Sequence, residues 1–245
     1  MFMALGAVAD MLGCKNETCE IIRRLDSSAG VSFEEVKRAG MESCLAKVTV
    51  TSDSPEVTLS YLTEKIASLE VCDSTKQTLD KFVKIKAEAR AVTPEDAKFA
   101  LGCELCEIYA VGAICELLAK QNVDKVYCSG VRYADGAIFT DDGFESATSP
   151  ETGYIARKYN ISTLPYFTEK EIFTQGGAAL LGAMGVLFCN ISGTVCKIGY
   201  GAGEHELEDA PNILRAVLGD EGEREGISFE AESLSFDFSA EISVL

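Results

Sequence analysis

The most distinctive pair of reactive side chains in the sequence is Cys103 and Cys106, spaced Cys-x-x-Cys. The apolar pattern of residues 103–120 predicts a helix that begins here, so both thiols would share one face near the positive end of the helix dipole. That position lowers the pKa of a thiol. Two thiolates are half of a tetrahedral metal site, and no second Cys-x-x-Cys completes it. The pair is therefore open to two interpretations, a metal or redox role and a structural pair of thiols.

A second candidate site begins at Thr174, a suitable N-cap for a small-residue helix over 174–184. Gly176 and Gly177 stand in the first turn of that helix, where they let another backbone or an anionic ligand approach the exposed amides. The same small residues also suit tight packing of a helix on a sheet. Both interpretations remain open at this stage.

The third candidate is Gly199-Tyr200-Gly201-Ala202-Gly203, which predicts a glycine turn after a strand over 194–198. It does not make a dinucleotide fingerprint, in which a strand and three spaced glycines are followed by a helix whose N-terminus meets the pyrophosphate, because here an acidic loop follows. The acidic residues that follow it are Glu204, Glu206, Glu208 and Asp209. Four carboxylates repel a phosphate, so a cation or a solvated loop fits this segment better than a bare nucleotide.

Alternating helices and strands must position these residues. The apolar periodicities predict helices over 17–25, 31–39, 61–69, 74–92, 103–120, 149–159 and 174–184, and strands over 44–50, 123–131, 194–198 and 236–244. This alternation predicts an α/β fold with a mixed or parallel sheet covered by helices.

The domain prediction is one α/β domain over residues 1–225, with a sub-boundary near 92–95. Residues 226–245 are predicted as a strand and linker. The strand pattern of 236–244 has an apolar face that a lone strand cannot bury. It must join the sheet here or lead towards an absent carboxy-terminal domain.

Composition limits the partners and the compartment. A net charge of −17 argues against nucleic acid and anionic membranes, which both need a basic surface. No apolar run approaches a membrane span, and the apolar start at Met1 lacks the basic leader of a signal peptide. Ten cysteines in such a chain indicate thiols rather than a disulfide framework. We expect a cytoplasmic protein.

Three segments of the last third resemble the nickel-insertion proteins of the nickel-pincer cofactor pathway. They are Gly176-Gly177-Ala178-Ala179-Leu180-Leu181, Ile198-Gly199-Tyr200-Gly201-Ala202-Gly203 and Pro211-Asn212-Ile213-Leu214-Arg215. Weaker support comes from Met1-Phe2-Met3-Ala4, Ala87-Glu88-Ala89-Arg90 and Asp124-Lys125-Val126-Tyr127-Cys128-Ser129.

The resemblance implies the amino-terminal part of a normally two-part protein. Such proteins use CTP and a divalent cation to insert nickel into a bis-thiocarboxylated pyridinium mononucleotide, the activity of a nickel-inserting lyase (cyclometallase). It implies a carboxy-terminal part as partner, in cis or in trans, which would supply the CTP-dependent chemistry. A homo-oligomer is also compatible with it.

The departures from the family pattern concern its metal ligands. The family has a strand and a Gly-x-x-Gly-Asp turn before the methionine that resembles Met1. It also has a His-x-His-Glu-x-Gly segment, which here is Ala97-Lys98-Phe99-Ala100-Leu101-Gly102 and keeps only the glycine. The sole histidine, His205, falls in the acidic loop, where a solvated side chain is a simpler interpretation than a ligand.

Two hypotheses follow. In the first, Cys103 and Cys106, with Glu104 or Glu107, replace the lost histidines as metal ligands. Substrate or nucleotide binding would then use the helix start at Thr174 and Gly177 and the predicted turn with Tyr200, Gly201 and Gly203, while Arg215 pairs with a carboxylate or phosphate. In the second, a catalytically inactive paralogue keeps the fold as a ligand- or partner-binding scaffold. Neither assigns a catalytic residue.

Overall fold

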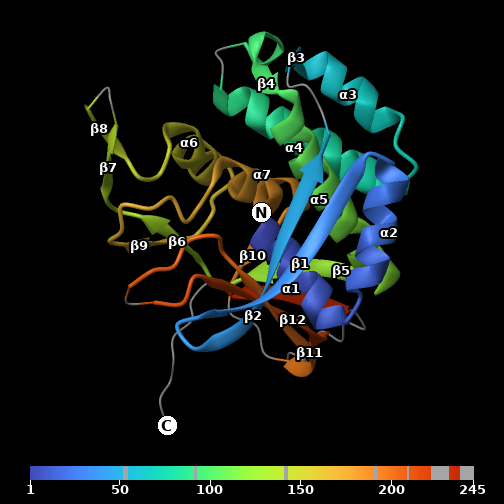
Figure 1. The fold of residues 1–245 in the computed structure, drawn as a ribbon, viewed down its shortest axis with the longest axis vertical. Helices are drawn as coiled ribbons and strands as arrows, with labels where there is room; N and C mark the ends of the chain where they lie inside the picture. Colours follow the sequence, from blue (N-terminus) through green and yellow to red (C-terminus); the bar gives the residue numbers. More distant parts are fainter. Residues whose placement is uncertain are drawn as a thin grey trace, which may run out of the picture.

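The fold is seen in a computed structural model (Figure 1) that describes residues 1–51, 55–90, 93–140, 143–189, 193–208, 210–221 and 232–237. The helices are α1 (Phe2–Leu12), α2 (Lys15–Leu25), α3 (Leu59–Ala67), α4 (Asp73–Arg90), the short 3-10 helix η1 (Pro94–Asp96), α5 (Leu101–Lys120), α6 (Pro150–Lys158) and α7 (Gln175–Met184). The strands are β1 (Ala29–Arg38), β2 (Met41–Val50), β3 (Glu56–Thr58), β4 (Lys98–Ala100), β5 (Val123–Cys128), β6 (Val131–Ala134), β7 (Ala137–Thr140), β8 (Gly143–Ser146), β9 (Thr163–Tyr166), β10 (Leu187–Phe188), β11 (Gly193–Ala202), β12 (Ile213–Glu221) and β13 (Glu232–Asp237).

One seven-stranded sheet organises the chain, in the order β1-β2-β11-β12-β13-β5-β10. Strands β1 and β2 pair antiparallel, as do β11 with β12 and β12 with β13. Strands β2 and β11, β13 and β5, and β5 and β10 pair parallel. The sheet is mixed, so the α/β prediction is confirmed.

Helix α1 packs directly on β11, β2 and β12 because glycines face it. A Cβ on Gly201 would overlap the carbonyl oxygen of Met3, and one on Gly199 would overlap the backbone of Met11. The two glycines thus let the helix and strand backbones approach each other closely.

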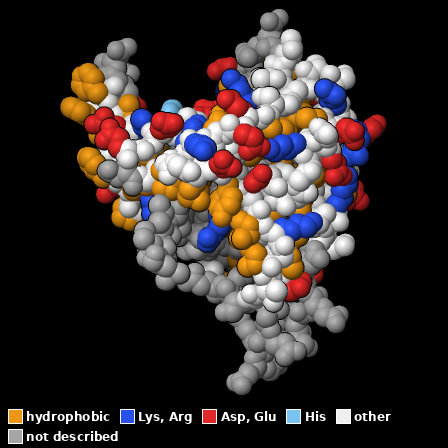
Figure 2. Space-filling model, turned by 60° about the horizontal axis from the view of Figure 1, so that its bottom comes forward, with side chains coloured by type: hydrophobic (Ala, Val, Ile, Leu, Met, Phe, Trp, Pro, Cys, Tyr) orange, Lys and Arg blue, Asp and Glu red, His pale blue; other side chains and the backbone are white. Residues whose placement is uncertain are grey.

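The opposite face of β11 and β12 is more open. Ile198 pairs with Val217 and Tyr200 with Arg215, and these side chains alternate with the ones that face α1. Ile198 is 46% exposed and Arg215 is also exposed. On the side turned forward in Figure 2, hydrophobic side chains lie in the open among charged ones. Helix α1 covers the other face of this part of the sheet.

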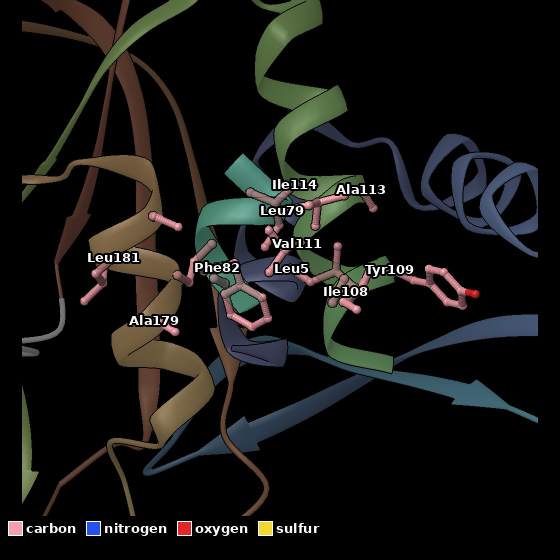
Figure 3. Close-up of a cluster of buried hydrophobic side chains, with 14 of the residues drawn as sticks. Leu5, Leu79, Phe82, Ile108, Tyr109, Val111, Ala113, Ile114, Ala179 and Leu181 are labelled. Carbon is pink, nitrogen blue, oxygen red and sulfur yellow. The ribbon is translucent and has the colours of Figure 1, made fainter. Parts of the chain in front are cut away.

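The main core lies between the helices and the sheet. Figure 3 shows Leu5 of α1, Phe82 of α4 and Ile108 of α5 side by side, and each is fully buried. This buried cluster of described residues includes side chains from both sides of the sub-boundary predicted near 92–95. Among the described residues, no helix combines the length and the apolar character that crossing a membrane requires.

Two local predictions differ from the structure. Residues 31–38 of the helix predicted over 31–39 belong instead to β1, because Val31 and Phe33 alternate with polar residues at a period of two and pair with β2. The predicted turn at 199–203 is instead mostly strand, since β11 continues to Ala202.

The strand predicted near the end of the sequence joins the sheet. Its described residues, 236 and 237, form the end of β13, which begins at Glu232 and pairs with β12 on one side and β5 on the other. The remainder of the predicted strand, residues 238–244, lies outside the described residues, as do residues 222–231 of the predicted domain junction.

Candidate functional site

A cavity of about 320 Å³ lies where three remote segments meet. They are the start of α1, the segment 171–174 with the first turns of α7, and residues 202–205, 207 and 211–214 from the end of β11 to the start of β12, while Leu45, Glu107, Val131 and Arg132 complete the lining. Most of its wall is apolar, with Phe2, Phe173 and Leu181 among the lining residues. A cavity of this size accommodates a small ligand.

The loop after β11 is fixed at the cavity by hydrogen bonds. Arg38, which is 9% exposed, donates from Nε to the carbonyl oxygen of Gly203 at 3.0 Å, and its Nη1 lies 3.6 Å from Glu206 Oε1. Gly203 donates its N–H to the Asn212 carbonyl at 2.8 Å, and Asn212 Nδ2 donates to the His205 carbonyl at 2.9 Å. The backbone of the acidic loop therefore has a defined course.

The start of α7 forms a second wall. The Thr174 hydroxyl accepts a hydrogen bond from the Gly177 N–H at 3.1 Å, which confirms the predicted N-cap. The Glu107 carboxylate lies beside Gly176 and so near the positive end of this helix. A side chain of the protein itself thus occupies the neighbourhood where the sequence predicted an external anion.

Glu107 belongs to a buried ionic network between α4 and α5. Lys86 Nζ donates to Glu104 Oε1 at 2.5 Å and also to Glu107 Oε2. The side chains of Lys86 and Glu104 are each 2% exposed, and Arg90 Nη2 lies 3.9 Å from Glu104 Oε2. Burial raises the pKa of Glu104 although Lys86 opposes this effect. Glu107, at 23% exposure, is the member of the network that reaches the cavity.

Three carboxylates line the cavity and give it a negative electrostatic potential. Glu107, Glu171 and Glu204 all line it and all act on the Met1 amino group, whose pKa burial lowers and these glutamates raise. Burial raises the pKa of Glu171, and the neighbouring Glu151 and Glu107 raise it further. Among the described lining side chains the one permanently cationic group is Arg132, so the cavity is acidic.

The structure brings together part of the predicted binding set. Thr174, Gly177 and Gly203 line the cavity. Gly201 instead faces α1, and Tyr200 donates its backbone N–H to Asp10 Oδ2 at 2.9 Å. The exposed Arg215 pairs with Tyr200 on the other face of the sheet, so these last three residues lie outside the cavity lining.

The predicted thiol pair lies apart from the cavity lining. Cys103 is exposed and Cys106 is half-buried. Burial raises the pKa of Cys106, and Cys103 raises it further, whereas the helix dipole was expected to lower it. Among the described residues, no three His, Cys, Asp or Glu side chains are already arranged to hold a metal.

Sequence reasoning missed Lys86 and Glu171 and treated His205 as a solvated side chain. His205 is exposed but lines the cavity. A signal for Lys86 was present, because it follows Phe82 and Val83 at helical spacing, in the positions that face the core. A lysine at an apolar position of a helix indicates a buried partner. Glu171 carried no comparable signal.

The family model described as "Nickel insertion protein" matches residues 2–236. A Methanosarcina mazei relative, named as a candidate nickel insertion protein, is 28% identical over 229 residues, which cover 88% of this chain and 56% of the relative. A Citrifermentans bemidjiense relative with the same name is 28% identical over 203 residues, covering 78% and 51%. The pyridinium-3,5-bisthiocarboxylic acid mononucleotide nickel insertion protein of Thermotoga sp. is 31% identical over 171 residues, covering 66% and 40%. The chain spans about half the length of the curated relatives it matches. No solved structure matches it.

Proposed function

Because this chain belongs to the nickel insertion protein family, we propose that its acidic cavity receives the nickel ion that is to be inserted. The ligands we assign are Glu107, Glu171 and Glu204, together with His205. The observation that carries the proposal is that these side chains, from three separate segments, line one cavity. Carboxylate and imidazole groups are suitable ligands for a divalent first-row metal.

An open arrangement suits an ion that must leave again. A structural metal is held by a closed ligand shell, whereas a metal that reacts keeps open positions. Glu204 and His205 are exposed, so their side chains can rotate towards the more fixed Glu107. The apolar part of the wall, which includes Phe2 and Phe173, would then face an aromatic ring such as the pyridinium of a mononucleotide substrate.

The remaining chemistry is assigned to a carboxy-terminal part, acting in cis or in trans with CTP and a divalent cation. This assignment is supported by the length of the Methanosarcina mazei relative, of which the chain covers 56%. Its test is reconstitution with a recombinant carboxy-terminal part, measuring nickel incorporation into pyridinium-3,5-bisthiocarboxylic acid mononucleotide with and without CTP. Incorporation by this chain alone would contradict the assignment.

The cavity and the thiol pair make different predictions for nickel binding. We expect Glu107→Gln to weaken the nickel affinity of the reduced protein by about tenfold or more, because it removes one charged ligand. A Cys103→Ser, Cys106→Ser double variant should bind like wild type. Isothermal titration calorimetry measures both, with Glu34→Gln on the exposed surface of β1 as the matched control.

The opposite result would reassign the site. Nickel binding that survives Glu107→Gln and disappears in the cysteine variant would show that the thiols have replaced the family histidines. Absence of binding in wild type would favour the inactive scaffold.

A further inference from the structure

We propose that Lys86 and Gly176 are positioning residues that hold the Glu107 carboxylate at the cavity wall. Lys86 would bind one carboxylate oxygen, and the missing side chain at Gly176 would leave space for the other. This inference rests on the proposed function, because it assumes that Glu107 binds the nickel ion. It assigns a role to two residues that do not themselves contact the ion.

Burying the Lys86 ammonium group costs free energy. Its ammonium group lies between α4 and α5 and is 5.3 Å from the centre of the Phe82 ring. Removing a lysine and a glutamate from water costs several kcal/mol per ion, and an apolar side chain of similar volume often serves stability as well. Glu104 is buried with Lys86, so this pair alone would neutralise the lysine. The additional bond to Glu107 connects the buried pair to the cavity.

Gly176 provides the complementary space. A Cβ there would overlap Glu107 Oε1 and would lie 2.9 Å from Cδ and 3.0 Å from Oε2. Any other residue would therefore push the carboxylate away from its present position. Glycine inside a helix is about 1 kcal/mol less favourable than alanine. Gly176 nevertheless stands in the first turn of α7, beside the Glu107 carboxylate.

A purely structural network would give the same picture, so the test needs a measurement that only positioning affects. If Lys86 acts through Glu107, its loss should not matter once Glu107 has lost its charge. The double variant Lys86→Met, Glu107→Gln should then bind nickel no more weakly than Glu107→Gln alone. Such a cycle isolates the coupling between the two residues.

The experiment measures nickel affinity by calorimetry and folding by thermal unfolding. We expect Lys86→Met and Gly176→Ala each to weaken nickel binding by about 10- to 100-fold, as the loss of an outer partner of a metal ligand does. Lys86→Met leaves Glu104 without its partner and risks misfolding, so Lys86→Met combined with Glu104→Gln is a second variant. Gly153→Ala in α6 is the matched control, because a Cβ there meets no atom within 4 Å.

Two results would overturn the inference while leaving the proposed function intact. One is wild-type nickel affinity in a folded Gly176→Ala protein. The other is an effect of Lys86→Met that adds fully to that of Glu107→Gln. Unchanged affinity in Glu107→Gln itself would instead refute the nickel site, and the positioning role with it.

Discussion

At the scale of single residues, Glu116 joins three segments of the chain through one carboxylate. Its Oε1 accepts hydrogen bonds from the Cys72 N–H at 3.1 Å and the Thr75 hydroxyl at 2.9 Å. Its Oε2 lies 3.1 Å from Arg24 Nη2. The side chain is 11% exposed, so these partners replace water and connect α5 to α2 and to the start of α4.

We predict that Glu116→Gln lowers the free energy of unfolding by about 1–3 kcal/mol at neutral pH, because the amide has no charge and only one acceptor oxygen for the partners that the two carboxylate oxygens serve. Burial tends to raise the pKa of Glu116, but the hydrogen bonds from Cys72 and Thr75 and the charge of Arg24 hold it below its usual range. Ionised Glu116 therefore stabilises the fold above the unfolded pKa of about 4.3, and this contribution is lost as pH falls through the lower folded pKa.

Urea unfolding at pH 7 and at successively lower pH measures this effect. The difference between wild type and Glu116→Gln should shrink on acidification, because wild type is then also uncharged at this position. A difference that stays constant down to the acid unfolding of wild type would contradict the assignment.

The site could be predicted only where its signal is local. The hydrogen bond of Thr174 to Gly177 spans three residues and follows from helix capping, so the sequence is enough to predict it. The bond between Lys86 and Glu104 joins two helices across 18 residues of chain. Nothing in the spacing of either helix indicates which carboxylate faces the lysine. The burial of Cys106, which reverses the predicted direction of its pKa shift, also depends on tertiary packing.

At the scale of elements, the contact between α1 and β11 depends on glycines, and we predict that Gly201→Ala lowers the free energy of unfolding by about 1–3 kcal/mol or more. A methyl group there meets the backbone of α1, which cannot rotate away as a side chain can. Gly153→Ala in α6 meets open space and should stabilise by about 0.5–1 kcal/mol. Urea unfolding of both variants provides the comparison, and equal midpoints would contradict close packing at Gly201.

Elements with a long, clear period were predictable. The periodicities of 103–120 and 149–159 gave α5 and α6, whose observed ends differ by at most two residues. The short pattern of 31–39 was ambiguous, and pairing with β2 selected the strand. The glycines at 199–203 indicate a turn by local rules, yet here they serve the packing of α1.

At the scale of the whole molecule, the order of the strands in the sheet bears on where the chain can be shortened. We predict that a chain ending at residue 225 loses cooperative unfolding, because it lacks β13 between β12 and β5. A chain ending at 237 should keep it. Urea unfolding tests this prediction. The slope of the free energy of unfolding against urea concentration reports the surface exposed on unfolding. Equal slopes and midpoints would instead support the predicted domain over 1–225.

The position of β13 also has a consequence for synthesis on the ribosome. Strands β5 and β12 leave the exit tunnel before β13, yet β13 is the strand that joins them in the sheet. Until it emerges, the facing edges of both strands remain unpaired, and unpaired edges are sites of aggregation. From the emergence of β12 until β13 has emerged, the nascent chain therefore exposes two unpaired strand edges, and chaperone protection is most valuable to it during this interval.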